Sequence, residues 1–232
     1  TPLATNLIGL FNQPEKVYLD IETWKTLPER QLSSGLAETI KHACLADGEM
    51  FDYLEKNIEK ILVNDKDACE YIAEHNCAVK YKVVMKDERE SGLREVLNLG
   101  HTVGRAIETV SDYKLLHGEA VSIGLIAQAK LGEKYGYISP ENVSRVIKLC
   151  ERAKLPIAIP DYIDKTALVR KLYTDKKVRD GKLRMVFQKE IGDVMCFGDN
   201  DYAKQITEPE IAEVIDAVSY THLRAHETLA NL

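Results

Sequence analysis

Residues 94–108 read REVLNLGHTVGRAIE, and this segment combines a helical apolar period with a row of polar side chains. One face of the expected helix is apolar and carries Val96, Leu97, Val103 and Ile107. A second face carries polar or ionisable residues at i, i+4, i+7 and i+11, namely Arg94, Asn98, His101 and Arg105. The pattern predicts one helix over residues 93–110 with a polar stripe along it.

The stripe has two interpretations. A helix that buries an apolar face usually turns its charges outward, so a solvated face is the first. The remaining positions do not form a charged surface, however, and include Leu99, Gly100, Thr102 and Gly104. Buried polar groups must find partners, and glycines in a helix are tolerated where another backbone or a ligand comes close. The second interpretation is therefore a binding site.

A metal site is one form that such a binding site could take. His101 has a possible companion in His117, which begins the next expected helix after a short loop. Zinc takes about four ligands, and a catalytic site leaves one position open. Two histidines need a carboxylate, and Glu38 is a candidate because Lys41 at i+3 shares its helix face. From spacing alone, a Glu-Lys pair of this kind is usually an ordinary surface salt bridge, and periodicity does not select Glu38.

The composition limits the classes of partner. The chain has 232 residues with 31 basic and 37 acidic side chains, a formal net charge of −6 and no basic block. Nucleic-acid binding needs clustered Lys and Arg, so nucleic acid is not an expected partner. No apolar run is long enough for a membrane span, and the first residues lack a signal-peptide pattern. Five scattered cysteines without CxxC spacing indicate reduced thiols. These features predict a cytoplasmic protein.

Hydrophobic periodicity predicts a mostly α-helical chain. Helices are expected over residues 35–63, 65–86, 93–110, 117–136, 139–155, 164–177 and 208–218. Ser139 and Pro140 form a cap and first-turn signature. A short extended run covers residues 16–20, and a β-hairpin with its turn at Asp180–Gly181 is expected within residues 177–197.

The two ends do not look like parts of one native domain. The chain opens without methionine inside an apparent loop, so a segment upstream is expected to be missing. Residues 218–228, VSYTHLRAHET, match one reading frame of a transposon-end adapter used in sequencing libraries. We therefore expect residues 1–30 to be the remnant of another domain and linker, 31–217 the main domain, and 218–232 adapter read-through.

Six segments in order resemble the 3-dehydroquinate synthase family of sugar phosphate cyclases over residues 1–217: NLIGLFNQP, TLPER, GLAETIK, DERESGLREVLNLGHTVG, LLHGEAV and DKKVRDGKLR. The resemblance implies a mostly α fold, namely the C-terminal helical metal- and substrate-binding domain with a small β-hairpin. The family's N-terminal nucleotide-binding α/β domain is expected to be absent.

The resemblance also implies roles for individual residues. The implied metal ligands are Glu38, His101 and His117. The implied substrate and catalytic positions are Lys41, Lys80, Arg94, Asn98, Lys176 and Lys177, with Glu90 as proton acceptor. The implied NAD contacts are Asn6, Thr23, Trp24, Lys25 and Thr26. Two positions depart from the family pattern: Arg105 replaces a histidine credited with proton transfer, and Thr5 replaces a lysine near the nucleotide.

The implied reaction converts 3-deoxy-arabino-heptulosonate 7-phosphate into 3-dehydroquinate and phosphate in the shikimate pathway, which leads to chorismate and the aromatic amino acids. NAD takes and returns a hydride, and zinc, or cobalt in its place, activates a substrate hydroxyl. This activity would be that of a phosphate-eliminating lyase, homodimeric when full length. The alternatives are a sibling cyclase, a metal-dependent alcohol dehydrogenase, a non-catalytic helical binding module and an inactive fragment.

Overall fold

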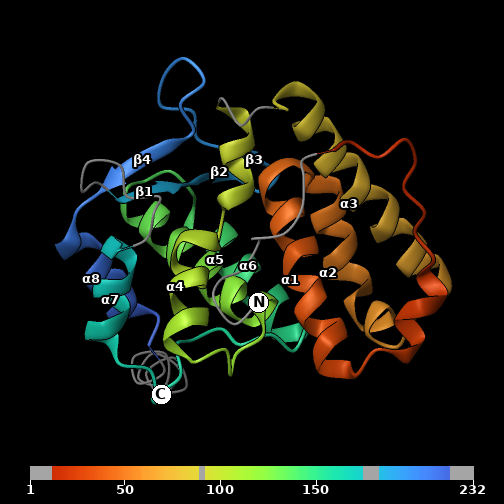
Figure 1. Cartoon of the computed structure of the whole chain (residues 1–232), viewed down its shortest axis with the longest axis horizontal. Helices are drawn as coiled ribbons and strands as arrows, with labels where there is room; N and C mark the ends of the chain where they lie inside the picture. Colours follow the sequence, from red (N-terminus) through yellow and green to blue (C-terminus); the bar gives the residue numbers. More distant parts are fainter. Residues whose placement is uncertain (1–11, 89–91, 175–182, 220–232) are drawn as a thin grey trace.

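The computed structural model describes residues 12–88, 92–174 and 183–219 (Figure 1). Within these ranges the chain is mainly α-helical, which confirms the predicted fold class. The α-helices are α1 (Glu29–Ala46), α2 (Gly48–Leu62), α3 (Lys66–Lys86), α4 (His101–Val110), α5 (His117–Lys134), α6 (Pro140–Arg152), α7 (Lys165–Thr174) and α8 (Glu208–Ala217). Two 3-10 helices, η1 (Ile21–Thr26) and η2 (Leu93–Asn98), precede α1 and α4.

The helix predicted over residues 35–63 is two helices, and it begins earlier than expected. α1 starts directly after Pro28, whose fixed φ suits a helix start. Asp47 separates α1 from α2 because its backbone is non-helical and its side chain accepts a hydrogen bond from the Met50 N–H (2.9 Å). A side chain that caps the next helix in this way competes with helix continuation. Apolar periodicity alone does not detect such a break.

The prediction of one helix over residues 93–110 is wrong. The chain forms η2, becomes extended at Leu99 and turns through Gly100 in the left-handed region (φ 76°) before α4 begins at His101. A side chain at position 100 would also lie 3.0 Å from the Val121 carbonyl oxygen. The Gly100 N–H donates instead to the buried side chain of Gln128. Glycine is needed here for its conformation and for the close approach of α5.

α4 crosses α5 with backbone almost in contact with backbone. A Cβ on Gly124 would lie 2.0 Å from the Gly100 carbonyl oxygen and 2.7 Å from the Gly104 nitrogen. α5 is buried along most of its length, as its apolar sequence predicts, and Gly136 follows its end with φ 73°. Figure 1 shows α5 and α6 behind α4, with α1 and α2 on one side and α7 and α8 on the other.

The structure describes the predicted β-hairpin only from residue 183 onward, so the pairing across its turn stays a prediction. β1 (Leu183–Val186) pairs antiparallel with β4 (Ala203–Ile206). The hairpin observed joins β2 (Gln188–Glu190) to β3 (Asp193–Val194), and Gly192 in its turn has φ 89°. Asp180 and Gly181 lie outside the described residues. β1 finds its partner in β4 because its inward side chains, such as Met185 (0% exposed), belong to the common core.

Residues 16–20 do not form a strand in the described structure. Val17 and Tyr18 are 71% and 86% exposed, and the run has no neighbouring strand within the described ranges. α6 starts as predicted: the Ser139 hydroxyl accepts from the Asn142 N–H (3.2 Å), and Pro140 occupies the first turn. Neither α5 nor any other described helix has the length and apolar character that crossing a bilayer requires.

The described residues of the 218–232 segment, Val218 and Ser219, pack against the domain. Val218 is fully buried, and its carbonyl accepts from the Ile159 N–H (2.8 Å). The proposed division of the chain at residues 30 and 217 stays a prediction. All five cysteines lie in the described ranges and are free thiols.

Candidate metal centre

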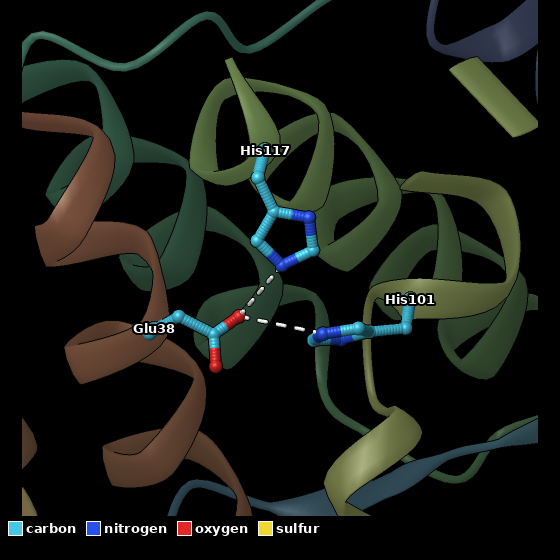
Figure 2. A group of neighbouring side chains, drawn as sticks. All are labelled: Glu38, His101 and His117. Carbon is cyan, nitrogen blue, oxygen red and sulfur yellow. Dashed lines mark ion pairs between the residues drawn. The ribbon is translucent and has the colours of Figure 1, made fainter. Parts of the chain in front are cut away.

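Three side chains from three helices converge at one point (Figure 2). Glu38 comes from the middle of α1, whereas His101 and His117 are the first residues of α4 and α5. Glu38 Oε1 lies 3.5 Å from His101 Nε2 and 3.6 Å from His117 Nε2. One ligand atom from each residue lies within 4.8 Å of the others. The structure thus brings together the three residues that the sequence suggested as metal ligands.

Hydrogen bonds on the far side of each ring orient the two imidazoles. His101 Nδ1 lies 3.1 Å from the Leu99 carbonyl oxygen, and His117 Nδ1 lies 3.1 Å from Glu108 Oε2. Both oxygens are acceptors only, so each Nδ1 carries the proton. The two Nε2 atoms therefore present lone pairs toward Glu38, which is the arrangement that metal-binding histidines require.

The Glu38 carboxylate shows that a cation fits this place. Its Oε2 accepts from Lys41 Nζ (2.6 Å), but its Oε1 is buried and has no hydrogen-bond partner among the described residues. A buried carboxylate oxygen facing two lone pairs is unfavourable unless a cation lies between them. Two imidazole nitrogens and one carboxylate oxygen form the donor set of many catalytic zinc sites. Ligand atoms about 2.0–2.1 Å from a tetrahedral ion are about 3.3 Å apart, close to the 3.5 and 3.6 Å between Glu38 Oε1 and the two Nε2 atoms.

The charge states of Glu38 and His101 agree with this interpretation. Burial opposes ionisation of Glu38, but the favourable electrostatic interactions with His117, Lys41 and His101 outweigh it, so the pKa of Glu38 lies well below its usual range. Burial, together with the charge of Lys41, lowers the pKa of His101 to about 4. The neighbouring carboxylates of Glu38 and Glu108 raise the pKa of His117 despite partial burial. His101 is therefore neutral at pH 7 and available as a ligand.

Lys41 is the cation nearest to this centre. It is 3% exposed, and its Nζ contacts Glu38 and the Leu97 carbonyl oxygen (3.2 Å). Burial lowers its pKa, and the charges of Lys80 and Arg105 lower it further. Both of these residues are exposed, and each lies within electrostatic range of Lys41, which contacts the candidate ligand Glu38.

Arg94 and Asn98 do not continue the row of residues on α4. They lie on η2, before the break at Leu99, so the predicted single stripe is in fact two segments. The Arg94 N–H donates to Asp87 Oδ2 (2.8 Å), and its Nη1 donates to the Glu88 carbonyl oxygen (3.1 Å). η2 contacts α1 and α3, which keeps both residues on the side of the domain that carries Glu38 and Lys80.

The candidate nucleotide-contacting residues Thr23, Trp24, Lys25 and Thr26 form most of η1. Lys25 pairs with Glu22 (2.6 Å), and the hydroxyls of Thr23 and Thr26 donate to carbonyls of the same segment. Trp24 packs against the core. The other candidates, Asn6, Glu90, Lys176 and Lys177, lie outside the described residues.

The sequence analysis did not identify Glu108, whose carboxylate accepts from His117 Nδ1 on the ring edge away from Glu38. A signal was present, because Glu108 follows His101 by seven residues and so lies two turns further along the same face of α4. Its partner His117 belongs to another helix, and the sequence does not reveal the distance between Glu108 and His117.

Comparison with known proteins identifies the family. The family model described as 3-dehydroquinate synthase C-terminal matches residues 35–178, and the chain belongs to this family. The 3-dehydroquinate synthase of Aliivibrio fischeri (strain MJ11) is 43% identical over 216 residues, which cover 93% of this chain and 58% of the relative. That of Methylococcus capsulatus is 46% identical over 193 residues, covering 83% and 54%. The chain thus spans little more than half the length of these curated relatives.

Solved structures agree on the fold. A 2-epi-5-epi-valiolone synthase from Streptomyces hygroscopicus subsp. jinggangensis 5008, with NAD+ and Zn2+ bound, superposes with a TM-score of 0.75 at 25% identity; the match covers 86% of this chain and 54% of that one. A 2-deoxy-scyllo-inosose synthase complexed with carbaglucose-6-phosphate, NAD+ and Co2+ gives a TM-score of 0.81 at 23% identity, covering 90% and 58%. The second likeness shows the fold alone.

Proposed function

We propose that this chain is the metal- and substrate-binding part of a 3-dehydroquinate synthase, which converts 3-deoxy-arabino-heptulosonate 7-phosphate into 3-dehydroquinate and phosphate. The observation that carries the proposal is the unpaired, buried Glu38 Oε1 between the Nε2 atoms of His101 and His117. Family membership and the NAD+ and Zn2+ or Co2+ of the solved neighbours support the same cofactors here. The activity makes the full-length protein a phosphate-eliminating lyase of the shikimate pathway.

The ligands Glu38, His101 and His117 hold the divalent ion. When bound, the ion supplies a Lewis acid that lowers the pKa of a substrate hydroxyl. The chain's own contribution at this point is orientation, because Leu99 and Glu108 fix both rings through their Nδ1 protons. Lys41 keeps the second oxygen of Glu38 charged and directed, which leaves Oε1 for the ion.

The substrate carries a carboxylate and a phosphate, and the cations around the centre suit it. Arg94 offers a planar fork, whereas Lys80 offers a point charge from an exposed position. Asn98 can both donate to and accept from a hydroxyl. Outside the described residues, we assign Lys176 and Lys177 to the anionic end of the substrate and Glu90 to proton acceptance. Arg105 holds anionic charge but cannot shuttle a proton.

NAD binding involves a larger part of the protein than this chain. We assign Thr23–Thr26 and Asn6 to the edge of the NAD site. We assign the other NAD contacts to the part of the relatives that this chain does not match. On this basis the 232-residue chain alone is catalytically inactive, and the full-length protein acts as a cytoplasmic homodimer. Neither nucleic acid nor a membrane is a proposed partner.

A sibling sugar phosphate cyclase is the second candidate, because both solved neighbours described above act within this fold. The solved 2-deoxy-scyllo-inosose synthase is complexed with carbaglucose-6-phosphate, which carries a phosphate but no carboxylate. The cationic set of Lys80 and Arg94 favours the acid substrate.

Metal analysis and an activity assay test the proposal. The purified chain should contain about one zinc per molecule, and His101→Ala should lose it. Phosphate release from the heptulosonate phosphate should appear when this chain is joined to the unmatched part of a relative such as that of Aliivibrio fischeri. Unchanged zinc in His101→Ala contradicts the ligand assignment, whereas turnover of a different sugar phosphate alone supports the sibling.

A further inference from the structure

The first three residues of α5, His117–Glu119, each contact one residue of α1. The partners on α1 are spaced by four: Arg30, Ser34 and Glu38. Residues four apart lie one above the other on a helix face. α1 therefore presents a straight row of side chains to the start of α5, and this row ends at the metal centre.

Arg30 forms the end of the row furthest from the metal centre. Its Nε donates to Glu119 Oε1 (2.6 Å), and its Nη2 donates to Glu119 Oε2 (2.7 Å) and to the Lys114 carbonyl oxygen (2.8 Å). Glu119 Oε2 also accepts from the Leu116 N–H (2.7 Å). A planar guanidinium fixes both the distance and the angle of a carboxylate. Arg30 thus ties α1 to both sides of the turn that precedes His117.

Ser34 forms the middle of the row. Its hydroxyl oxygen accepts from the Gly118 N–H (3.1 Å), and both residues are buried. A Cβ on Gly118 would lie 1.8 Å from the Ser34 carbonyl oxygen. The first turn of α5 therefore rests directly on the backbone of α1, one turn before Glu38.

Glu38 and His117 complete the row with a distance of 3.6 Å between Oε1 and Nε2. We propose that Arg30 and Ser34 are positioning residues of the metal centre, which set the separation of the Glu38 carboxylate and the His117 imidazole without touching the ion. This inference rests on the metal centre of the proposed function. Neither residue is among those that the family resemblance assigns to the site.

The exposure of Arg30 makes its role separable from folding. The Arg30 side chain is 57% exposed, so water can replace it beside Glu119, which is 12% exposed and keeps its hydrogen bond from the Leu116 N–H. Loss of a group that orients a metal ligand lowers metal affinity by about 10- to 100-fold. The two effects have different readouts, namely the Tm of the metal-free chain and the affinity for Zn2+.

The test measures the Zn2+ affinity of the full 232-residue chain by competition with a chromogenic chelator. Arg30→Ala should weaken binding by about 10-fold with little change in the metal-free Tm, and Arg30→Lys should restore part of the loss. Arg152→Ala is the matched control, because Arg152 forms an equivalent fork with Glu59 (both bonds 2.8 Å) between α6 and α2. Its Zn2+ affinity should equal that of the parent.

Ser34→Ala provides an independent measurement if Arg30→Ala does not fold. It should weaken Zn2+ binding by a similar factor and alter the visible absorption spectrum of Co2+ bound in place of zinc. Parental Zn2+ affinity in Arg30→Ala or, failing that variant, in Ser34→Ala overturns the inference, as does an equal loss in Arg152→Ala. A parent chain that binds no Zn2+ overturns the proposed metal centre as well, so the two failures are distinguishable.

Discussion

Nδ1 of His117 lies 3.1 Å from Oε2 of Glu108, on the side of the imidazole that faces away from Glu38. A carboxylate in this position fixes the ring and makes its other nitrogen a better donor to a cation. α4 therefore supplies one candidate ligand, His101, and also Glu108, which orients the other candidate ligand, His117. The positions of both depend on how α4 crosses α5.

Replacing Glu108 should weaken metal binding without removing a ligand. Glu108→Ala is expected to lower Zn2+ affinity by about 100-fold and Glu108→Gln by about 10-fold, because the amide still accepts the Nδ1 proton but carries no charge. Competition with a chelator measures both. Glu95→Gln, which alters a carboxylate 3.8 Å from Arg184, is the control and should leave the affinity unchanged. Equal affinities in all three variants and the parent would show that Glu108 does not support His117.

A glycine-to-alanine substitution should lower stability where α4 crosses α5 closely and raise it at an open helix position. Gly124→Ala should destabilise the chain by about 3 kcal/mol or more, because the new Cβ meets the Gly100 carbonyl oxygen at 2.0 Å. Gly35→Ala, on an exposed position of α1 with open space around it, should stabilise by about 0.5–1 kcal/mol. Urea unfolding followed by circular dichroism measures both. A Gly124→Ala chain as stable as the parent would falsify the observed crossing.

His42 predicts a loss of stability in mildly acidic solution. Burial, with the charge of Lys41, lowers its pKa from 6.5 to about 4, and its Nδ1 lies 2.9 Å from Asn76 Oδ1. The unfolded chain therefore binds a proton at a higher pH than the folded chain, and stability falls as pH drops from 6.5 toward 4. The size of this effect is about 3 kcal/mol.

Unfolding of the metal-free chain at a series of pH values checks this prediction. His42→Gln removes the titrating group, so its stability should change less over the same range. An identical pH dependence in parent and variant would assign the acid sensitivity to other groups.

The family resemblance implies a histidine where this chain has Arg105, whose exposed position on α4 makes it easy to replace. In a full-length protein, Arg105→His should raise kcat, by up to about 100-fold if proton transfer limits the rate. Arg105→Gln removes the charge without adding a titratable group and serves as the control. An equal rise in both variants would indicate relief of excess positive charge rather than restored proton transfer.

The sequence predicted most of the helices because their signals are local. Ser139 and Pro140 predict the start of α6, and the apolar run of α5 ends near Gly136. The breaks were harder to predict. Asp47 and Gly100 interrupt apolar patterns that continue on both sides, and the reason for each break is a contact with another part of the chain or a cap.

Long-range pairing was the other gap in the prediction. The turn signal at Asp180–Gly181 suggested a local hairpin, whereas β1 pairs with β4 about twenty residues later. For the site, spacing suggested Glu38, His101 and His117 but left the salt-bridge alternative open. The choice depended on the family resemblance, because the distances among three helices come from packing and not from periodicity.

Gly100, Gly104 and Gly124 let the main chains of α4 and α5 meet without side chains between them. The spacing of the two histidines that begin these helices is consequently set by peptide groups, which do not change when residues mutate. Substitutions elsewhere in the interior can change the volume of the hydrophobic core while the distance between the starts of these two helices stays the same. Such a domain tolerates substitutions at many interior positions but almost none at Gly100, Gly104 and Gly124.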